Sequence, residues 1–291
     1  ALSPAARFRA AAVAFALAPG LLPAAAPAAT QAADPEEIEV VTRAEKARRT
    51  PGAAETVAFQ GELATALSRG NTETFLLSTN ARLTWAFADR WLSETRGTAL
   101  YEESFDVNTA NKWAVFERVD RFVSERFSAF AGLGIERDPF SALDYRHSAQ
   151  LGAAFLVIED LVQDEGEEVV RNKLQVELGA YAARETFVVP PNAPPDTVLD
   201  DRARDVIAAR AAAGYQHAFR RGTSAGVEVE AIQDFVDTEN FVLNDSVWVA
   251  AALVDGLALK LTFTHRYDAL PASEEVEKND LLLTAGLVVS L

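Results

Sequence analysis

The stretch that decides the fold class is Leu257–Asp268, which reads LALKLTFTHRYD. Its odd-numbered positions carry L, L, L, F, H and Y, and its even-numbered positions carry A, K, T, T, R and D. Successive side chains of a β-strand point to opposite faces of the sheet. The alternation therefore predicts a strand with one apolar face and one polar face.

The same alternation recurs along the chain from Val57 onward, and it is clearest in residues 127–136, 172–182 and 225–235. Turn-forming residues separate these runs at 69–72, 89–90, 107–108, 124–126, 138–139, 164–166, 190–196, 220–223, 237–240, 255–256 and 271–277. These breaks predict about twelve strands of roughly 10 to 16 residues each.

Three features favour a membrane-spanning barrel over a soluble β-sandwich: strand length, the placement of the aromatic residues, and the signal peptide described below. Strands of soluble proteins usually have about 5 to 6 residues, fewer than the runs found here. Aromatic residues also gather near both sets of turns, as Trp85 and Trp91 do at one end and Trp113 and Tyr267 at the other. The two interfaces of a bilayer select this placement. We therefore expect an all-β fold, an antiparallel transmembrane β-barrel of about 12 strands.

The N-terminal region differs in kind from the rest. Arg7 and Arg9 precede an apolar run, and small residues follow as far as Ala33, which is the layout of a signal peptide. We expect residues 1–33 to be that signal peptide, 34–56 a periplasmic linker or short helix, and 57–291 the barrel. The predicted location is the bacterial outer membrane, with both chain ends in the periplasm. The acidic stretch 159–171 is unusually long for a periplasmic connection.

Composition excludes several classes of function. The formal net charge is -16, with 43 acidic and 27 basic residues, and a nucleic-acid partner needs a basic surface instead. The chain has no Cys, so disulfides and thiolate chemistry are excluded. No uncharged apolar stretch of about 18 residues follows the leader, so no transmembrane helix is predicted. The expected partners are outer-membrane lipids and, during insertion, the barrel assembly machinery.

Three stretches of the chain resemble one known family. They are residues 61–72 (GELATALSRGNT), residues 136–140 (ERDPF) with 143–146 (LDYR), and Tyr267-Asp268 with the segment from Pro271 to Asp280. Together they resemble the family of salt-induced outer-membrane proteins, over nearly all of the chain from Gly61 onward. The resemblance implies the Gram-negative outer membrane as the location. That family has no assigned function, so it implies no catalytic residues.

The histidines give no sign of catalysis. The chain has three, His147, His217 and His265, and none has Ser or Asp two positions away on its own strand face. A lipase or protease of the outer membrane needs such a pair. The motifs G-x-S-x-G, P-loop and H-E-x-x-H are absent as well. We therefore predict that the protein is not an enzyme, with no cofactor and no metal, and that the histidines are interfacial side chains.

The polar face of the predicted strands is rich in charges of both signs. We expect the following residues to line the lumen: Glu62, Arg82, Glu94, Arg96, Glu136, Arg146, Lys173, Glu177, Arg204, Arg210, Glu228, Glu230, Lys260 and Arg266. Two interpretations stay open. The charges could form a structural lattice of ion pairs that fills the lumen, or they could line a narrow water-filled pore. The first corresponds to a structural or envelope-stress barrel, and the second to a passive channel.

The connections predicted to face outward are rich in acids. We expect an outer rim that includes Asp138, Asp144, Asp200, Asp201, Glu274 and Glu275. Clustered carboxylates repel one another, so weak cation binding at this mouth is one hypothesis, and a solvated hydrophilic rim is the other. If the barrel holds a pore, a rim of this sign favours cations over anions.

Overall fold

The computed structural model describes residues 55–68, 74–105, 107–164, 167–194, 197, 199, 202–220, 222–254, 256–271 and 276–290. The expected signal peptide and nearly all of the expected linker lie outside the described residues. The strands are β1 (Thr56–Ser68), β2 (Thr74–Ala86), β3 (Trp91–Ser104), β4 (Val107–Phe122), β5 (Phe127–Asp138), β6 (Leu143–Asp164), β7 (Glu167–Phe187), β8 (Ala203–Arg220), β9 (Thr223–Asp234), β10 (Phe241–Val254), β11 (Leu257–Asp268) and β12 (Asn279–Ser290). One 3-10 turn, Pro139–Ser141, separates β5 from β6.

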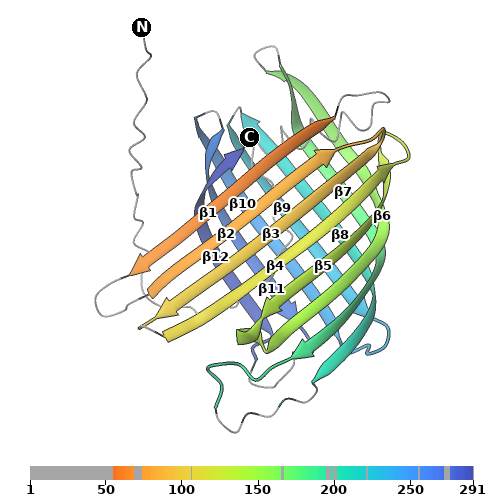
Figure 1. The fold of residues 1–291 in the computed structure, drawn as a ribbon. Helices are drawn as coiled ribbons and strands as arrows, with labels where there is room; N and C mark the ends of the chain where they lie inside the picture. The colour runs from red at the N-terminus through yellow and green to blue at the C-terminus, as the bar shows by residue number, and fades with distance from the viewer. Residues whose placement is uncertain are drawn as a thin grey trace.

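The twelve strands form one closed antiparallel barrel in which each strand pairs with its neighbours in sequence (Figure 1). Closure comes from β1 and β12, where Gln60 lies opposite Ser290 and Ala64 lies opposite Gly286. A closed barrel has no strand edge, so every strand has two neighbours to satisfy its backbone groups. The predicted fold class is confirmed.

The barrel has two different ends. The terminal end holds Thr56 and Ser290 and the short connections after β2, β4, β6, β8 and β10. Gly222 and Gly256 adopt positive φ angles of 79° and 76° in two of these connections, a conformation that glycine adopts without steric cost. The loop end holds the other connections, of which 188–202 between β7 and β8 is the longest. The turn predicted at 107–108 is wrong by two residues. The connection lies at 105–106, because β3 ends at Ser104 and β4 begins at Val107.

The outside of the barrel is apolar and the inside is polar. Large apolar side chains point outward, among them Leu178, which is 69% exposed, and Leu133 and Leu151, at 67% and 65%. Buried positions include many charged side chains, such as Lys260 and Glu185. A soluble protein arranges these classes the other way, whereas a barrel in lipid requires this arrangement. Among the described residues, no helix is long and apolar enough to cross a membrane.

Strands β6 and β7 continue beyond the wall at the terminal end. Pairing of β5 with β6 stops at Phe127 and Phe155, and pairing of β7 with β8 begins at Asn172 and His217. The two strands pair with each other beyond these points, with register shifts at Leu156/Ile158 and Asp160/Leu161. Their hairpin rises above the other strand ends at the top of Figure 1. The predicted long acidic connection, 159–171, is therefore mostly β-strand.

Val170 of this hairpin is buried at 6% exposure, in one apolar cluster with Trp248 and Ala250 of β10. Trp248 points into the lumen, because the even-numbered residues of β10 face inward. Strands β8 and β9 separate β7 from β10 in the barrel wall. The hairpin therefore covers part of the lumen at the terminal end.

Candidate functional site: the charged lumen

The inward faces of the strands form the candidate site. The structure places on this inner side every residue that the alternation assigns to the polar face: Glu62, Arg82, Glu94, Arg96, Glu136, Arg146, Lys173, Glu177, Arg204, Arg210, Glu228, Glu230, Lys260 and Arg266. The local cause is the period of two along each strand, which sends every second side chain inward. How these side chains meet depends on which strands face one another across the lumen.

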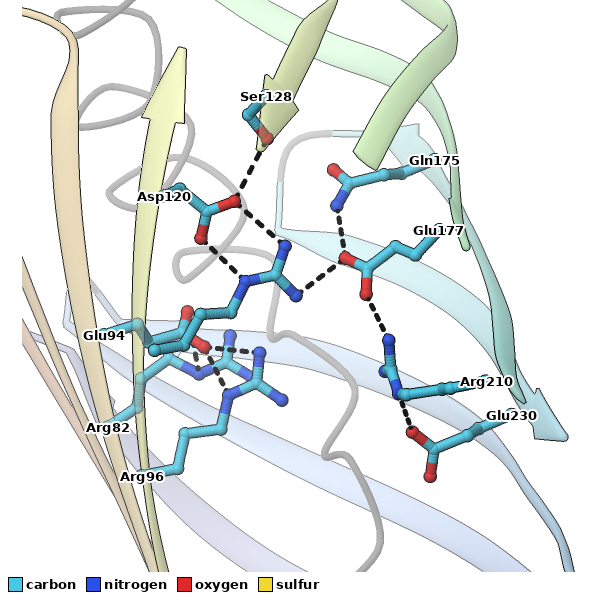
Figure 2. A network of polar contacts seen from close by, with 10 residues as sticks. Arg82, Glu94, Arg96, Asp120, Ser128, Gln175, Glu177, Arg210 and Glu230 are labelled. Carbon is cyan, nitrogen blue, oxygen red and sulfur yellow. Dashed lines mark hydrogen bonds and ion pairs between the residues drawn. The ribbon is translucent and has the colours of Figure 1, made fainter. Parts of the chain in front are cut away.

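One chain of ion pairs crosses the lumen (Figure 2). Arg118 of β4 donates from Nη1 to Glu177 Oε1 of β7 at 2.8 Å. On the other side of Glu177, Arg210 of β8 donates from Nη1 to Oε2 at 2.8 Å and from Nε to Glu230 Oε1 of β9 at 2.5 Å. Arg118 also holds Asp120 on its own strand through two hydrogen bonds, at 2.7 and 2.9 Å. We call the contact between Arg118 and Glu177 the lumen bridge.

Aromatic and glycine residues fix the position of the lumen bridge. The Arg118 guanidinium lies 3.9 Å from the centroid of the Phe130 ring, which adds a cation–π contact to the ion pairs. On β5, a Cβ at Gly132 would come within 2.5 Å of the Phe116 ring. The glycine therefore leaves room for Phe116 to lie against the wall beside Arg118.

Further ion pairs occupy the rest of the lumen. Glu94 of β3 lies between Arg82, at 3.8 Å, and Arg96, which also hydrogen-bonds to it. Nearer the loop end, Arg146 joins Glu136 and Glu185 at 2.7 Å each. Arg204 reaches the same Glu185 at 2.7 Å, and Arg266 lies 3.8 Å from Glu136. Lys260 lies 3.3 Å from Glu62, across the β12 strand that separates their strands.

Two cavities lie beside the lumen bridge. The larger has a volume of about 290 Å³ and is lined by residues from β2 to β10, including Trp248 and Glu228. The smaller, about 80 Å³, lies towards the terminal end and is lined by Asp120 and Ser128 among others. Both cavities have Glu94, Arg96, Arg118, Gln175 and Glu177 in their walls. The ion pairs of the lumen bridge therefore separate the two spaces.

The alternation missed several inner charges, notably Arg118, Asp120, Lys112 and Glu185. Strand β4 shows why, because Lys112, Arg118 and Asp120 lie inside while Glu117 and Arg121 lie on the opposite face. Glu117 accepts hydrogen bonds from Ser93 and Thr95 of β3 on that outer face. With charges on both faces, the sequence of β4 has no apolar side to identify. The cross-lumen partner of Glu177 could not be found from local pattern.

The rim acids that the structure describes already have partners. Asp138 is buried and accepts hydrogen bonds from the backbone N and the hydroxyl of Ser141 at the 3-10 turn. Asp144 forms an ion pair with Arg137 at 3.4 Å. The other expected rim acids, Asp200, Asp201, Glu274 and Glu275, lie outside the described residues. The predicted cation-binding rim stays a prediction.

The histidines lie on the outer face of the barrel. His265 of β11 contacts Asp245 of β10 at 2.8 Å and Asn279 of β12 at 3.1 Å, and His217 contacts Asn172 at 2.7 Å. The spacing of residues along one strand does not reveal Asp245, because this partner comes from the neighbouring strand. Within the described strands and loops, no serine or threonine hydroxyl hydrogen-bonds to a histidine ring. In the same residues, no group of three or more His, Asp or Glu could hold a metal ion.

Comparison with known proteins gives one family match and several similar folds. Residues 61–291 match the family model described as protein of unknown function, DUF481. The NanC porin structure aligns with 81% of this chain and 98% of its own at 8% identity and a TM-score of 0.43. An outer membrane channel from Pseudomonas putida F1 aligns with 84% and 98% at 12% identity and a TM-score of 0.42. The NalP translocator domain from Neisseria meningitidis aligns with 88% and 93% at 7% identity and a TM-score of 0.41. No curated protein was found to match the sequence.

Proposed function

Because the chain belongs to the protein family of unknown function DUF481, which assigns no activity, we propose a role from the structure alone. The protein is an integral barrel of the bacterial outer membrane whose lumen is largely filled by ion pairs and conducts little. Its role in the cell is structural or related to envelope stress. The name "salt-induced", suggested by the resemblance of the three stretches, stays a prediction.

The location rests on the outer surface of the barrel. Leu151, Leu178 and the other large apolar residues of that surface would be exposed to water in a soluble protein, which would strongly favour association. In a lipid bilayer the same side chains contact acyl chains and are not exposed to water. Short connections at the terminal end and longer ones at the loop end favour an orientation with the terminal end in the periplasm. The barrel then reaches the membrane through a signal peptide.

The lumen bridge is the main observation that supports a closed lumen. Arg118 of β4 and Glu177 of β7 join two parts of the wall that lie three strands apart, at 2.8 Å, and the side chains of both are about nine-tenths buried. Such a buried pair is costly to break. Removal of one partner leaves an uncompensated buried charge, which lowers stability by about 3 to 5 kcal/mol. The Val170 contact with Trp248 closes a second part of the lumen towards the terminal end.

Conductance of the refolded protein in planar bilayers tests this closure. We compare the wild type with Arg118→Gln/Glu177→Gln, which removes both charges of the bridge together. The matched control is Arg184→Gln/Asp205→Asn, an ion pair on the outer surface whose side chains are 63% and 68% exposed. We expect low conductance for wild type and control, and a severalfold rise for the bridge variant. Equal, large conductance steps in all three would contradict the closed lumen.

A narrow cation-preferring channel is the second candidate. The observation that favours it is the pair of cavities of about 290 and 80 Å³ in the lumen, both with charged residues in their walls, since a small movement of the lumen bridge would join them. In that case the wild type itself conducts in brief openings. Reversal potentials under a salt gradient then show preference for cations, and anion preference would exclude this candidate.

We also propose that the protein is not an enzyme. His265 and Asp245 are the pair closest to a catalytic arrangement, at 2.8 Å, but among the described residues the other ring nitrogen of His265 contacts the amide of Asn279 and not a hydroxyl. Refolded protein is expected to hydrolyse lipid and peptide no faster than a boiled control. Turnover that His265→Ala abolishes would overturn the proposal.

A further inference from the structure

The larger lumen cavity has chemically different walls on its two sides. Strands β2, β3 and β4 contribute Arg82, Arg96 and Arg118 to it, with one acid, Glu94, which pairs with Arg82 and Arg96. Strands β9 and β10 contribute Glu228, Glu230, Asn244 and Ser246, and no base. In the strand order, β3 and β9 lie on opposite sides of the ring. The cavity therefore has a guanidinium wall, which we define as Arg82, Arg96 and Arg118, facing an oxygen wall, which we define as Glu228, Asn244 and Ser246.

Each residue of the oxygen wall has a buried oxygen without a hydrogen-bond partner. These atoms are Glu228 Oε2, Asn244 Oδ1 and Ser246 Oγ. Glu228 lies directly opposite Ser246 in the pairing of β9 with β10, and Asn244 lies opposite Glu230, two residues along each strand. Ser246 is 2% exposed. A buried polar atom without a partner costs about 1 to 3 kcal/mol, so the wall favours an occupant that donates hydrogen bonds.

The orientation of the Asn244 amide is fixed by a neighbour. Its Nδ2 donates to Glu230 Oε2 at 2.9 Å, so its Oδ1 is left as an acceptor. Glu230 is in turn held by Arg210 at 2.5 Å. The oxygen wall therefore offers acceptors on a rigid support. Its carboxylate, Glu228, favours a donor that carries positive charge.

The guanidinium wall favours an anion. Arg82 and Arg96 share one carboxylate, Glu94, and each guanidinium has five N–H donors in a planar fork that matches a carboxylate. An occupant that satisfies both walls carries a positive donor at one end and a negative acceptor at the other. A simple cation or anion would satisfy only one wall and would be repelled by the other.

We propose that this cavity binds a small zwitterion with an ammonium and a carboxylate group, as in a free amino acid. The ammonium donates to Glu228, Asn244 and Ser246, and the carboxylate lies against Arg82 and Arg96. A volume of about 290 Å³ limits the occupant to a small molecule, since ligand pockets begin at about this size. Trp248 packs beside the oxygen wall and is 1% exposed, so its indole reports on the occupant.

The test uses three probes that separate the two charges. L-Serine carries both, ethanolamine lacks the carboxylate, and glycerate lacks the ammonium. Each is titrated into refolded protein in detergent, with the probe also present during refolding so that a closed lumen does not exclude it. The readout is the fluorescence of Trp248 in a variant with Trp85→Phe, Trp91→Phe and Trp113→Phe. We expect a saturable change in fluorescence with L-serine. We expect ethanolamine and glycerate to bind with at least tenfold lower affinity.

Variants on the oxygen wall complete the test. Glu228→Gln is expected to weaken L-serine binding at least tenfold. Ser246→Ala is a smaller change that serves if Glu228→Gln refolds poorly, and it is expected to weaken L-serine binding severalfold. The matched control is Glu117→Gln, which removes a carboxylate from the outer face and leaves binding unchanged. No saturable change with L-serine, or equal binding of ethanolamine or glycerate, would overturn the proposal. The inference rests on the proposed lumen, but binding is read by fluorescence and closure by conductance, so the two can fail separately.

Discussion

At the scale of single residues, Gly226 shows how an absent side chain shapes the lumen. A Cβ at this position would come within 2.6 Å of the Trp248 ring. The glycine on β9 therefore allows the indole of β10 to lie flat against the inner wall, where Lys260 also approaches it at 5.9 Å. The buried Trp248 in turn supports Val170. One missing methyl group thus determines how the terminal end of the lumen is packed.

Gly226→Ala tests this packing. The added methyl must displace the indole, because the Trp248 ring leaves it no room, so we expect a loss of about 1 to 3 kcal/mol in the free energy of unfolding. Urea unfolding in lipid vesicles, followed by tryptophan fluorescence, measures it. The control is Gly97→Ala on β3, where a Cβ would meet nothing within 4 Å. Equal stability of the two variants would show that Trp248 does not rest on Gly226.

At the scale of elements, the β6–β7 hairpin is the feature that departs from a plain barrel. Its strands span Leu143–Asp164 and Glu167–Phe187, the longest in the molecule, and they extend past both neighbours. The bulges near Ile158 and Leu161 bend the pair, since a bulge increases local bend and twist. The bend brings Val170 onto Trp248 instead of into solvent. The element therefore acts as a cover over the lumen.

Val170→Ser is expected to loosen this cover. With less apolar contact, water and small solutes reach Trp248, so its quenching by acrylamide rises severalfold in the variant that retains Trp248 alone. Ile158→Ser, on the same hairpin but 37% exposed, is the control and leaves quenching unchanged. If acrylamide quenches Trp248 no more strongly in Val170→Ser than in the control, the hairpin does not shield the lumen.

At the scale of the whole molecule, the barrel reverses the usual distribution of polarity. Its apolar clusters inside are small, and charged pairs hold the interior instead. Stability then comes from backbone pairing around a closed ring, from ion pairs within it and from lipid outside. Closure makes these contributions cooperative, because no strand can leave without opening two neighbours.

Leu178→Arg tests the lipid-facing surface. Leu178 lies near the middle of the wall and is 69% exposed, and a charge at the bilayer midplane costs about 2 to 4 kcal/mol. Unfolding in vesicles measures this loss against Val189→Arg, in the β7–β8 connection and 44% exposed, for which little change is expected. In a soluble protein Leu178→Arg would instead be neutral and would improve solubility.

The sequence by itself determined the all-β fold class, the number of strands and the inward-facing side of most strands. Alternation such as that of residues 257–268 and turn residues such as Asp255-Gly256 are local signals, because side-chain direction depends only on position along one strand. Strand β4 marks the limit, since Lys112 and Arg118 inside are matched by Glu117 and Arg121 outside. There the local pattern does not define a face.

Only the tertiary structure decided which charges meet. Arg118 contacts Glu177 because the curvature of the wall lets inward side chains of β4 and β7, three strands apart, meet inside the lumen. The contact of His265 with Asp245 and that of Val170 with Trp248 likewise join different strands. Such contacts depend on register, strand tilt and barrel closure, which are properties of the whole ring. The sequence therefore supplied the charges of the lumen, and the closed barrel decided that they form a bridge with a two-walled cavity beside it.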